Sequence, residues 1–520
     1  MKSIQVYDTT LRDGSQGEKI NFSAKDKLRI AQRLDSVGVH YIEGGWPGSN
    51  PKDVQFFELA QSVSFKKARL SAFGSTRKPN ASAKKDANII ALLQSETPAV
   101  TIFGKSWDLH VKKVLGTTLK ENLAMINDSV AHLVSQGREV IYDAEHFFDG
   151  YKNNPEYATK TIEAAVSGGA DWIVLCDTNG GTLPFEIEEI MESICPHIPV
   201  KVGIHTHNDS GLAVANTLVA VRAGAVMVQG TVNGYGERCG NADLTTVIPN
   251  LQLKMGRSCI TKKNLSHLTE LSRYVSEVAN MTPFNGRPFV GKSAFAHKGG
   301  IHVNAIMKTP KAYEHMGPEA IGNERRVLVS DLSGKSNIDY KAREMGVELG
   351  GNGFDSRSIA KEIKRLEHEG YQFDAAEGSF ELLLKRLTGQ FKALFEVESF
   401  RVSIEKEKNF PCKAYATIKI SVGDQQEIAA AEGNGPVSAL DNALRKALNK
   451  FFLVDLEEMH LVDYKVRVIE GRDGTSARVK VFIESRDQKR VWGTIGVSTD
   501  IIEASWQALE DSFQYKLSHT

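Results

Sequence analysis

The chain contains 520 residues, and its 64 Lys and Arg balance 64 Asp and Glu, so the formal net charge is zero and the isoelectric point is near 7.2. This balance argues against the basic surface of a nucleic-acid-binding protein, and the lack of any run of 18 apolar residues argues against a membrane span. The five cysteines are few and scattered, as in proteins that keep free thiols in a reducing compartment, so we expect a soluble, cytoplasmic protein.

Short apolar runs alternate with helical patterns through residues 1–256. Strands are predicted at residues 4–7, 41–43, 69–73, 99–103, 139–142, 172–176, 201–205 and 226–230, and helices between them include residues 24–37, 119–135, 154–167 and 212–223. Several helices end at a glycine, as in SVGVHYIEGG and VSGGADWIV, because glycine accepts the left-handed conformation that closes a helix. Eight strand–helix units predict a closed (β/α)8 TIM barrel, and an open, doubly wound sheet is the alternative.

In such a barrel, the loops after the C-terminal ends of the strands gather on one face and carry the active site. The polar residues predicted on that face are Arg12 and Asp13 after the first strand, Glu145 after the fifth, Thr178 after the sixth, His205 and His207 at the seventh, and Asn241 after the eighth. Any one of them could be only a turn residue or a helix cap. Aspartate, two histidines and asparagine on one rim nevertheless favour a binding site.

His205 and His207 are the clearest sign of a metal site. Residues i and i+2 of an extended strand project to the same side, about 6.6 Å apart at about 3.3 Å per residue, so both imidazoles can bind one ion. Carboxylate, imidazole and amide oxygen ligands suit Mg²⁺, Mn²⁺ or Zn²⁺ with open coordination positions. The alternative is a hydrogen-bonded histidine pair without a metal.

The strand–helix alternation stops after residue 256. Residues 257–395 predict mainly helical linker subdomains, with helices at 265–279, 358–369 and 380–395 joined by Gly-rich loops such as GKSAFAHKGG and LGGNGFDSR. The motif HKGGIHVNA, which contains His302, lies in this region. We expect it to contribute to the active site by reaching a barrel mouth, that of a partner subunit, so that activity depends on dimerisation.

An internal repeat occupies residues 396–520. The segments AYATIKISV, QQEIAAAEG and SALDNALRKALNKF are followed about 65 residues later by ARVKVFIES, RVWGTIGVS and EASWQALEDSFQYKL, so that Ala443 and Leu444 align with Ala508 and Leu509. Two strand-rich units, each closed by an amphipathic helix, predict a pseudo-symmetric α+β regulatory domain. A dimerisation module without a ligand is the alternative.

Seven motifs together resemble one enzyme family over essentially the whole chain. DTTLRDGSQ, HTHNDSGLAVANT, NGYGERCGNADL and HKGGIHVNA are similar to the motifs of the acetyl-CoA-condensing synthases, which include isopropylmalate, homocitrate and citramalate synthases. EGGWPGSNPKD, YDAEHFFDGY and RRVLVSDLSGKSN resemble the citramalate synthase branch. The resemblance implies an acyltransferase that condenses acetyl-CoA with a 2-keto acid in a Claisen-type reaction and then hydrolyses the thioester.

In the citramalate synthase branch the keto acid is pyruvate, and the product, citramalate, feeds isoleucine biosynthesis. The alternative within the family is a 2-isopropylmalate synthase, which acts on 2-ketoisovalerate in leucine biosynthesis. Because both would use the same site on keto acids of different bulk, only the residues that shape the pocket would separate them. The EGGWPGS loop is expected to help shape that pocket.

The resemblance also implies the roles of the rim residues. A divalent ion, Mn²⁺, Mg²⁺ or Zn²⁺, would be bound by Asp13, His205 and His207, with Asn241 as a fourth ligand, and would polarise the ketone of the keto acid. Asp8, in the same motif as Asp13, is expected only to hold its loop by hydrogen bonds.

Arg12 is expected to face the oxygen on which negative charge develops. With Thr178 and Glu145, it would also bind the keto acid. Either Glu145 or His302 could be the base that removes a methyl proton from acetyl-CoA. Each also has an alternative role: Glu145 could bind the keto acid, and His302 could activate water. His297 and His110 are assigned no part in the chemistry.

The C-terminal region resembles the allosteric domain of the same synthases. This implies a homodimer and an end-product amino-acid effector, isoleucine rather than leucine. A lyase of the same barrel type is a further alternative, but such lyases carry a cysteine in a Gly-Gly-Cys-Pro setting, whereas Cys239 lies in GERCGNADL. A non-catalytic amino-acid sensor is the last alternative, and the intact set of Arg12, Asp13 and the two histidines argues against it.

Overall fold

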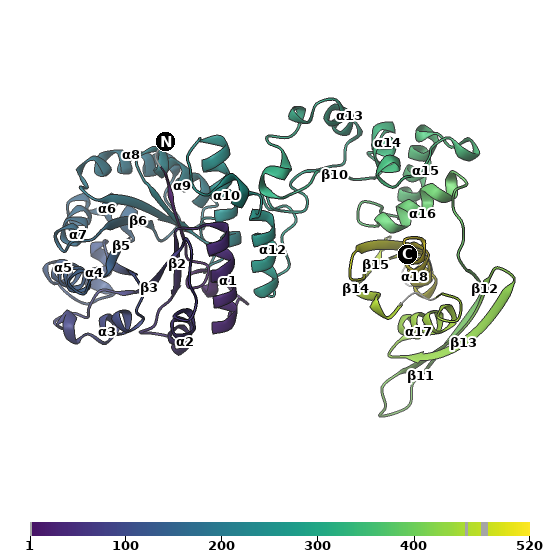
Figure 1. Ribbon diagram of the computed structural model, residues 1–520, viewed down its shortest axis with the longest axis horizontal. Coiled ribbons are helices and arrows are strands. Elements are labelled where there is room, and N and C mark those ends of the chain that lie inside the picture. The colour runs from purple at the N-terminus through teal and green to yellow at the C-terminus, as the bar shows by residue number, and fades with distance from the viewer. Residues whose placement is uncertain (1–2, 453–455, 470–476) are drawn as a thin grey trace. The chain divides into compact units, whose positions relative to one another are not determined.

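The computed structural model describes residues 3–452, 456–469 and 477–520 (Figure 1). The chain forms two compact units, which we call the barrel unit (Met1–Phe295 and Met316–Glu324) and the C-terminal unit (Ala296–His315 and Arg325–Thr520). In the described part of the chain, no helix is both long enough and apolar enough to cross a membrane.

The barrel unit contains eight parallel strands that pair in sequence order and close on themselves, β8 against β1. They are β1 (Gln5–Asp8), β2 (Tyr41–Gly45), β3 (Arg69–Ser75), β4 (Ala99–Lys105), β5 (Glu139–Glu145), β6 (Trp172–Asp177), β7 (Lys201–Thr206) and β8 (Met227–Gly230). Every predicted strand is confirmed, as is the closed barrel. Several strands are longer than predicted, because polar residues at the rim still form backbone pairs with the neighbouring strand. In β5, for example, the strand continues to Glu145, which pairs with Lys105 of β4.

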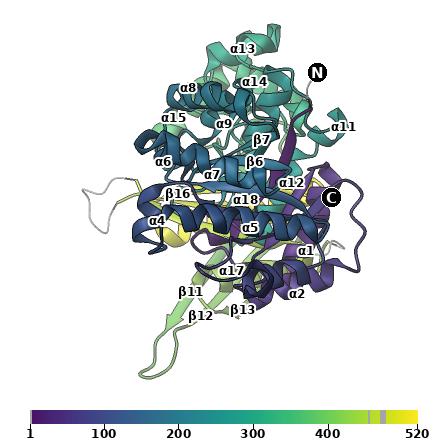
Figure 2. The same ribbon diagram turned by 90° about the vertical axis from the view of Figure 1, so that its left-hand side faces the viewer.

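Helices cover the outside of the strands, and Figure 2 shows α4 to α7 on one side of this layer. The helices of the barrel unit are α1 (Ala24–Val37), α2 (Pro51–Ala60), α3 (Ala87–Gln94), α4 (Asp108–Lys113), α5 (Leu119–Ser135), α6 (Phe147–Asn153), α7 (Pro155–Ser167), α8 (Pro184–Ile194), α9 (Ala213–Arg222), α10 (Leu244–Pro249), α11 (Lys262–Leu265) and α12 (Leu268–Val278). The helix predicted at residues 265–279 is therefore two helices, interrupted at Ser266 and His267.

Helix α1 shows why these helices begin and end where they do. The Ser23 hydroxyl accepts the backbone N–H of Asp26, and the Asp26 carboxylate accepts that of Ser23, which satisfies two free donors of the first turn. Gly38 ends the helix with φ of +90° and donates to Leu34. Ile30 and Leu34 lie one turn apart and are fully buried against the strands.

Side chains that point into the barrel form an apolar floor with a polar layer above it. The floor contains Tyr7, Tyr41, Ala99, Ile141, Trp172, Val174, Cys176 and Met227. Because side chains alternate between the two faces of a strand, the residue two positions after a floor residue also faces inward. This places Glu43 after Tyr41, Asp143 after Ile141 and Gln229 after Met227. The spacing of two residues thus sets both the packing of the floor and the height of the polar layer.

A buried ion pair supports the loop after β2. Lys27 of α1 is 2% exposed, and its ammonium group contacts the Asp53 carboxylate and donates to the carbonyl of Gly44 at 3.1 Å. The second oxygen of Asp53 accepts the backbone N–H of Trp46 at 2.8 Å. Charges this deep are stable only as a pair, so the pair holds the EGGWPGS loop in place.

Replacing Lys27 with methionine should lower the free energy of unfolding by about 3–5 kcal/mol, because the Asp53 carboxylate would remain buried without its cation. Denaturant unfolding followed by tryptophan fluorescence would measure the change. Lys25→Met, at an exposed position of the same helix, is the matched control and should change stability little. Equal stability of the two variants would show that the buried pair does not hold the loop.

The C-terminal unit begins with short strands and helices and ends with two antiparallel sheets. Its helices are α13 (Gly300–Lys308), α14 (Lys335–Glu344), α15 (Ser356–His368), α16 (Glu377–Leu387), α17 (Pro436–Leu448) and α18 (Ile501–Ser518); its strands are β9 (Ala296–His297), β10 (Arg326–Val327), β11 (Glu396–Glu405), β12 (Lys413–Val422), β13 (Gln425–Gly433), β14 (His460–Val468), β15 (Val479–Arg486) and β16 (Val491–Ser498).

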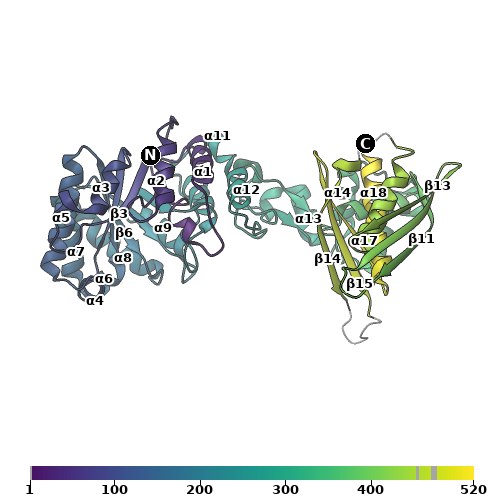
Figure 3. The same ribbon diagram turned by 90° about the horizontal axis from the view of Figure 1, so that it is seen from below.

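The predicted internal repeat is confirmed as two successive units of three strands and one helix, β11–β12–β13–α17 and β14–β15–β16–α18. Figure 3 shows α17 and α18 between the two sheets. Ala443 and Leu444 of α17 and their counterparts Ala508 and Leu509 of α18 are all buried in the core between the sheets. The aligned positions of the repeat are therefore the packing face of each helix.

The predicted helix at residues 380–395 is wrong in its second half. Helix α16 ends at Leu387, and Gly389 follows with φ of +74°, a conformation that closes a helix. Residues 388–395 then lead to β11, and Phe395 is buried in the core of the C-terminal sheets. Its apolar side chain fits the helical periodicity of the preceding residues, but it packs in the core of the C-terminal sheets and not on a continued helix.

Candidate active site

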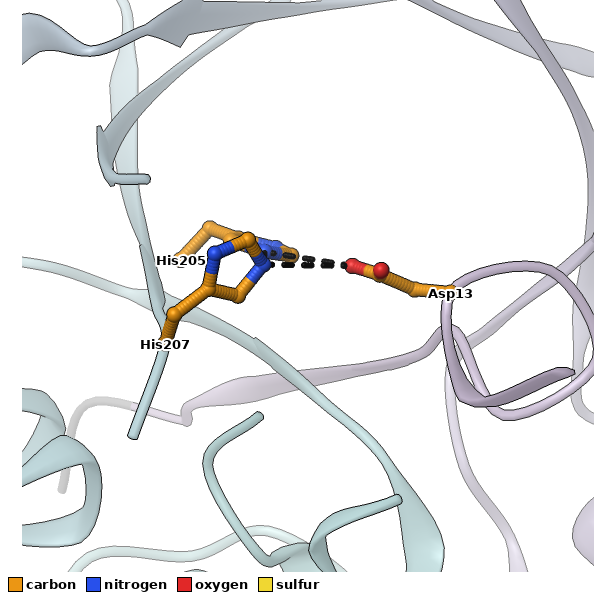
Figure 4. A group of neighbouring side chains, drawn as sticks. All are labelled: Asp13, His205 and His207. Atoms are coloured by element: carbon orange, nitrogen blue, oxygen red, sulfur yellow. Dashed lines mark hydrogen bonds and ion pairs between the residues drawn. The ribbon is translucent and has the colours of Figure 1, made fainter. Parts of the chain in front are cut away.

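Asp13, His205 and His207 lie together at the C-terminal rim of the barrel, with ligand atoms within 4.8 Å of one another (Figure 4). Nε2 of His205 is 3.4 Å, and Nε2 of His207 is 3.6 Å, from Oδ2 of Asp13. The two Nε2 atoms are 3.1 Å apart. Asp13 and His205 are 4% and 5% exposed, so this polar cluster is largely shielded from water.

The two imidazoles are oriented by hydrogen bonds on their other nitrogens. Nδ1 of His207 lies 2.6 Å from the backbone carbonyl of Thr178, which can only accept, and Nδ1 of His205 lies 2.8 Å from Oε1 of Gln229. When both Nδ1 atoms donate, both Nε2 lone pairs face Asp13. A shared divalent cation would stabilise two such lone pairs and the carboxylate at this distance, and outer hydrogen bonds of this kind are usual for metal-binding histidines. The residues present therefore fit a divalent metal ion.

Asn241 adds a further possible ligand beside His207, with which it forms an isolated antiparallel bridge. Its Nδ2 donates to the carbonyl of Tyr235 at 3.1 Å, whereas its Oδ1 is buried and has no hydrogen-bond partner. A buried acceptor without a partner costs about 1–3 kcal/mol. A bound cation or a hydrogen-bond donor would remove that cost, and this makes Oδ1 a candidate fourth ligand atom.

Arg12 is clamped between two carboxylates. Its Nε donates to Oε1 of the fully buried Glu43 at 2.6 Å, and its Nη1 lies 3.4 Å from Oδ1 of Asp13. The guanidinium also stacks on Phe73, with its central carbon 3.8 Å from the ring centroid. Glu43 accepts two further hydrogen bonds, from the hydroxyls of Tyr7 at 2.6 Å and Thr9 at 2.5 Å. Arg12 is thus a fixed cation with its remaining donors toward the site.

The charges of this group follow from burial and pairing. Burial alone would lower the pKa of Arg12, but the charges of Asp13 and Glu43 outweigh it and raise the pKa. Burial alone would raise the pKa of Asp13, but Arg12 and the two histidines hold it well below its usual value. For His207, the hydrogen bond and charge of Asp13 outweigh burial and raise the pKa. Asp13 is therefore ionised throughout the physiological range.

The Thr178 hydroxyl is oriented by the loop after β5. Its oxygen accepts the backbone N–H of His146 at 2.8 Å, so its own proton is left to donate to another acceptor. His146 has φ of +56°, a left-handed conformation that is uncommon for a residue with a side chain. Backbone strain of this kind often occurs at functional sites, and here it brings the N–H of His146 to Thr178.

A pocket of about 220 Å³ connects these residues. It is lined by Arg12, Asp13, Gln16, Trp46, Phe73, Phe103, Asp143, Glu145, Cys176, Thr178, His205, His207, Glu237 and Arg238. Six of the predicted rim residues line this pocket, and the seventh, Asn241, does not line it but forms the backbone bridge with His207. Glu145 forms an ion pair with Lys105. Three aromatic rings, Trp46, Phe73 and Phe103, pack edge to face or stacked against one another to form one wall.

The remaining predicted residues occupy different places. His302 lies on α13 of the C-terminal unit, exposed, with its ring 4.3 Å from that of Tyr313. His297 contacts Glu314, with Nε2 3.2 Å from Oε1. Asp8 accepts the N–H and the hydroxyl of Thr10, both at 2.9 Å, as expected for a residue that holds its loop.

Several residues of the site were missed from the sequence, among them Phe73, Phe103, Cys176, Glu237 and Arg238, which line the pocket, and the three supporting residues Glu43, Asp143 and Gln229. Glu43 holds Arg12, whereas Asp143 and Gln229 form hydrogen bonds in the polar layer below the metal cluster. Each is a polar residue inside a strand that is otherwise buried. A polar side chain in a buried strand two residues after an apolar one is a signal that would have found all three.

Comparisons with known proteins agree with this architecture. Residues 3–275 match the HMGL-like family model, residues 289–370 match a homocitrate synthase post-HMGL domain-like model, and residues 374–517 match the LeuA allosteric (dimerisation) domain. Among solved structures, the Bacillus subtilis HMG-CoA lyase is 19% identical, with a TM-score of 0.47, and covers 55% of this chain and 97% of its own.

Curated relatives match along the whole length. An (R)-citramalate synthase of Aquifex aeolicus is 55% identical over 99% of this chain and 98% of that protein, and one of Geobacter sulfurreducens is 54% identical over 99% and 98%. A 2-isopropylmalate synthase of Cronobacter sakazakii is 32% identical over 98% and 94%. The first two are far more similar to this chain than the third, and the chain belongs to the citramalate synthase family.

Proposed function

We propose that this protein is a metal-dependent acyltransferase that condenses acetyl-CoA with pyruvate and hydrolyses the thioester, releasing citramalate and CoA for isoleucine biosynthesis in the cytoplasm. The observation that carries the proposal is the cluster of Asp13, His205 and His207 beside a clamped arginine, inside a small pocket with an aromatic wall. Membership in the citramalate synthase family supports pyruvate as the acceptor.

Asp13, His205, His207 and Asn241 would hold the metal ion. When bound, a divalent ion polarises the ketone and stabilises the alkoxide formed on attack. Arg12 would place a fixed positive charge beside that oxygen, and fixed charges in a shielded site contribute strongly to catalysis. The Thr178 hydroxyl, whose oxygen is held by His146, would donate to the carboxylate of pyruvate.

Glu145 and His302 are the two candidates for the base that removes a methyl proton from acetyl-CoA. Glu145 lies on the pocket, paired with Lys105, and His302 belongs to the C-terminal unit, which would reach the site in a dimer. We expect only the variant that lacks the base, either Glu145→Gln or His302→Gln, to abolish deuterium exchange into the methyl group of a thioester-stable acetyl-CoA analogue. Unchanged exchange in both variants would exclude both residues from that role.

We expect the aromatic wall of Trp46, Phe73 and Phe103 to favour a small keto acid by limiting the room for a branched side chain. Phe103→Ala should raise the ratio of kcat/KM for 2-ketoisovalerate to that for pyruvate by about 10-fold or more, since one or two extra methyl groups in a fitted pocket are worth about 1–3 kcal/mol. Free CoA release would measure both rates. Phe185→Ala, 61% exposed on α8, is the control, and an equal ratio in both variants would contradict this view of the wall.

A panel of keto acids, assayed after chelation and with Mn²⁺, Mg²⁺ or Zn²⁺ added back, tests the proposal as a whole. We expect pyruvate to be preferred and turnover to require a metal. A strong preference for 2-ketoisovalerate would indicate a 2-isopropylmalate synthase, and turnover that survives chelation would refute the metal centre.

Regulation is the last part of the proposal. The match to an allosteric and dimerisation domain over residues 374–517 supports a homodimer with isoleucine as the effector. Isoleucine should reduce turnover more strongly than leucine at the same concentration. An enzyme that responds to neither amino acid would leave the repeat domain as a dimerisation module.

A further inference from the structure

Two hydrogen bonds in series connect β5, β8 and β7 beneath the metal cluster. Nε2 of Gln229 donates to Oδ1 of Asp143 at 3.0 Å, and Oε1 of Gln229 lies 2.8 Å from Nδ1 of His205. Gln229 and Asp143 are 1% and 4% exposed. Gln229 and His205 are register partners on adjacent strands, whereas Asp143 reaches the same layer from β5.

Asp143 decides which end of the Gln229 amide faces His205. An amide has one donating end and one accepting end, and here the amide nitrogen donates to Oδ1 of Asp143 at 3.0 Å. The amide oxygen is then left for His205.

The amide oxygen in turn decides which nitrogen of His205 carries the proton. Because Oε1 of Gln229 accepts, Nδ1 of His205 must donate, and the lone pair of the neutral ring is then on Nε2, the atom that faces Asp13 at 3.4 Å. His207 differs from His205 in this respect. Its Nδ1 contacts the backbone carbonyl of Thr178 at 2.6 Å, which no substitution removes, and also lies 3.1 Å from Nη2 of Arg238.

We propose that Gln229 and Asp143 are positioning residues that fix the tautomer of His205 and thereby set the affinity of the site for its divalent ion. This inference rests on the proposed metal centre. It also explains why the support is an amide. A carboxylate bonded to His205 would add a negative charge to the site, whereas a neutral amide leaves Asp13 as the only anionic ligand and keeps more positive charge on the ion.

The test is a titration of the metal-free, full-length protein with Mn²⁺ alone, without substrate, so that contacts of Asp143 with substrate cannot affect the result. Gln229→Leu should weaken Mn²⁺ binding by roughly 10- to 100-fold, as is usual when the partner of a metal-binding histidine is lost. Asp143→Leu should weaken it as well. The double variant should bind no more weakly than Gln229→Leu, because Asp143 acts through Gln229.

Two variants serve as controls. Asp143→Asn keeps an acceptor oxygen for the Gln229 amide and should retain Mn²⁺ affinity within a few-fold of the parent protein. Asn216→Leu removes another fully buried amide, one that donates to the carbonyl of Thr182 on the outer layer, and should leave Mn²⁺ binding unchanged. Circular dichroism establishes that each variant is folded.

The possible outcomes separate this inference from the proposal on which it rests. A folded Gln229→Leu protein that binds Mn²⁺ as tightly as the parent, or losses that add in the double variant, would overturn the positioning role. If Gln229→Leu does not fold, the comparison of Asp143→Leu with Asp143→Asn decides, because only the former should lose affinity. Failure of the parent protein to bind Mn²⁺, or binding unaffected by Asp13→Ala, would instead refute the metal centre.

Discussion

The His207→Ala variant should lose about 1,000-fold or more in kcat while remaining folded. Removing this ring takes one ligand from a cluster whose other members are Asp13 and His205. The polarisation of a ketone by a bound divalent ion is worth several kcal/mol, and about 4 kcal/mol corresponds to a factor of 1,000 in rate. The fold should survive because His207 lies after the end of β7 and outside the apolar floor of the barrel.

Three measurements check this prediction, namely turnover with excess Mn²⁺, Mn²⁺ affinity and thermal unfolding. His197→Ala, at an exposed position in the turn before β7, is a matched control that removes an imidazole away from the rim. We expect the control to retain normal kcat and Mn²⁺ affinity. Near-normal turnover of His207→Ala would remove this residue from the site.

The Arg12→Gln variant should lose about 100- to 1,000-fold in kcat, the range observed when one fixed stabiliser of a developing oxyanion is removed. Unlike loss of a ligand, this change should leave Mn²⁺ affinity equal or higher, because Asp13 would no longer be paired with a competing cation. Both substitutions should therefore lower the rate, but only His207→Ala should weaken metal binding.

Arg12→Gln should also lower stability, because Glu43 is fully buried and would keep only the hydroxyls of Tyr7 and Thr9 as partners. Arg12→Lys retains a charge and should be the more stable of the two variants, but it cannot reproduce the planar contact with Phe73. Arg29→Gln, on a side chain that is 66% exposed in α1, is the control for loss of an arginine. Normal turnover of Arg12→Gln would mean that this cation serves only to hold Glu43.

The fold was predictable where local signals and periodicity agree. Helices α1 and α5 have the predicted bounds because each begins at a hydroxyl cap, Ser23 or Thr118, and ends near a glycine. The helix predicted to reach Phe395 was wrong because apolar spacing does not reveal which core a side chain enters. Phe395 packs between the C-terminal sheets, a layer that does not exist until distant strands have assembled.

The part of the candidate site that follows from the geometry of the strands was predictable from the sequence. His205 and His207 are two residues apart in an extended segment, so their side chains point to the same side. Asp13 follows another strand at the same rim of the barrel and therefore lies next to them. The partners of these residues were not predictable in the same way. Gln229 of β8 meets Asp143 of β5 across the barrel interior, which depends on closure of the barrel. Glu43 of β2 meets Arg12 from the loop after the neighbouring strand β1.

The stepped interior of the barrel has a consequence for redesign. Strand β5 shows the steps: the apolar Ile141 lies at the base, the supporting Asp143 above it and Glu145 at the mouth, each step two residues long. Substituting only the side chains at the mouth, while the two lower layers are retained, should therefore allow other acceptor molecules to bind with little loss of stability. Deleting one residue from β7 would turn its remaining steps outward and remove the catalyst altogether.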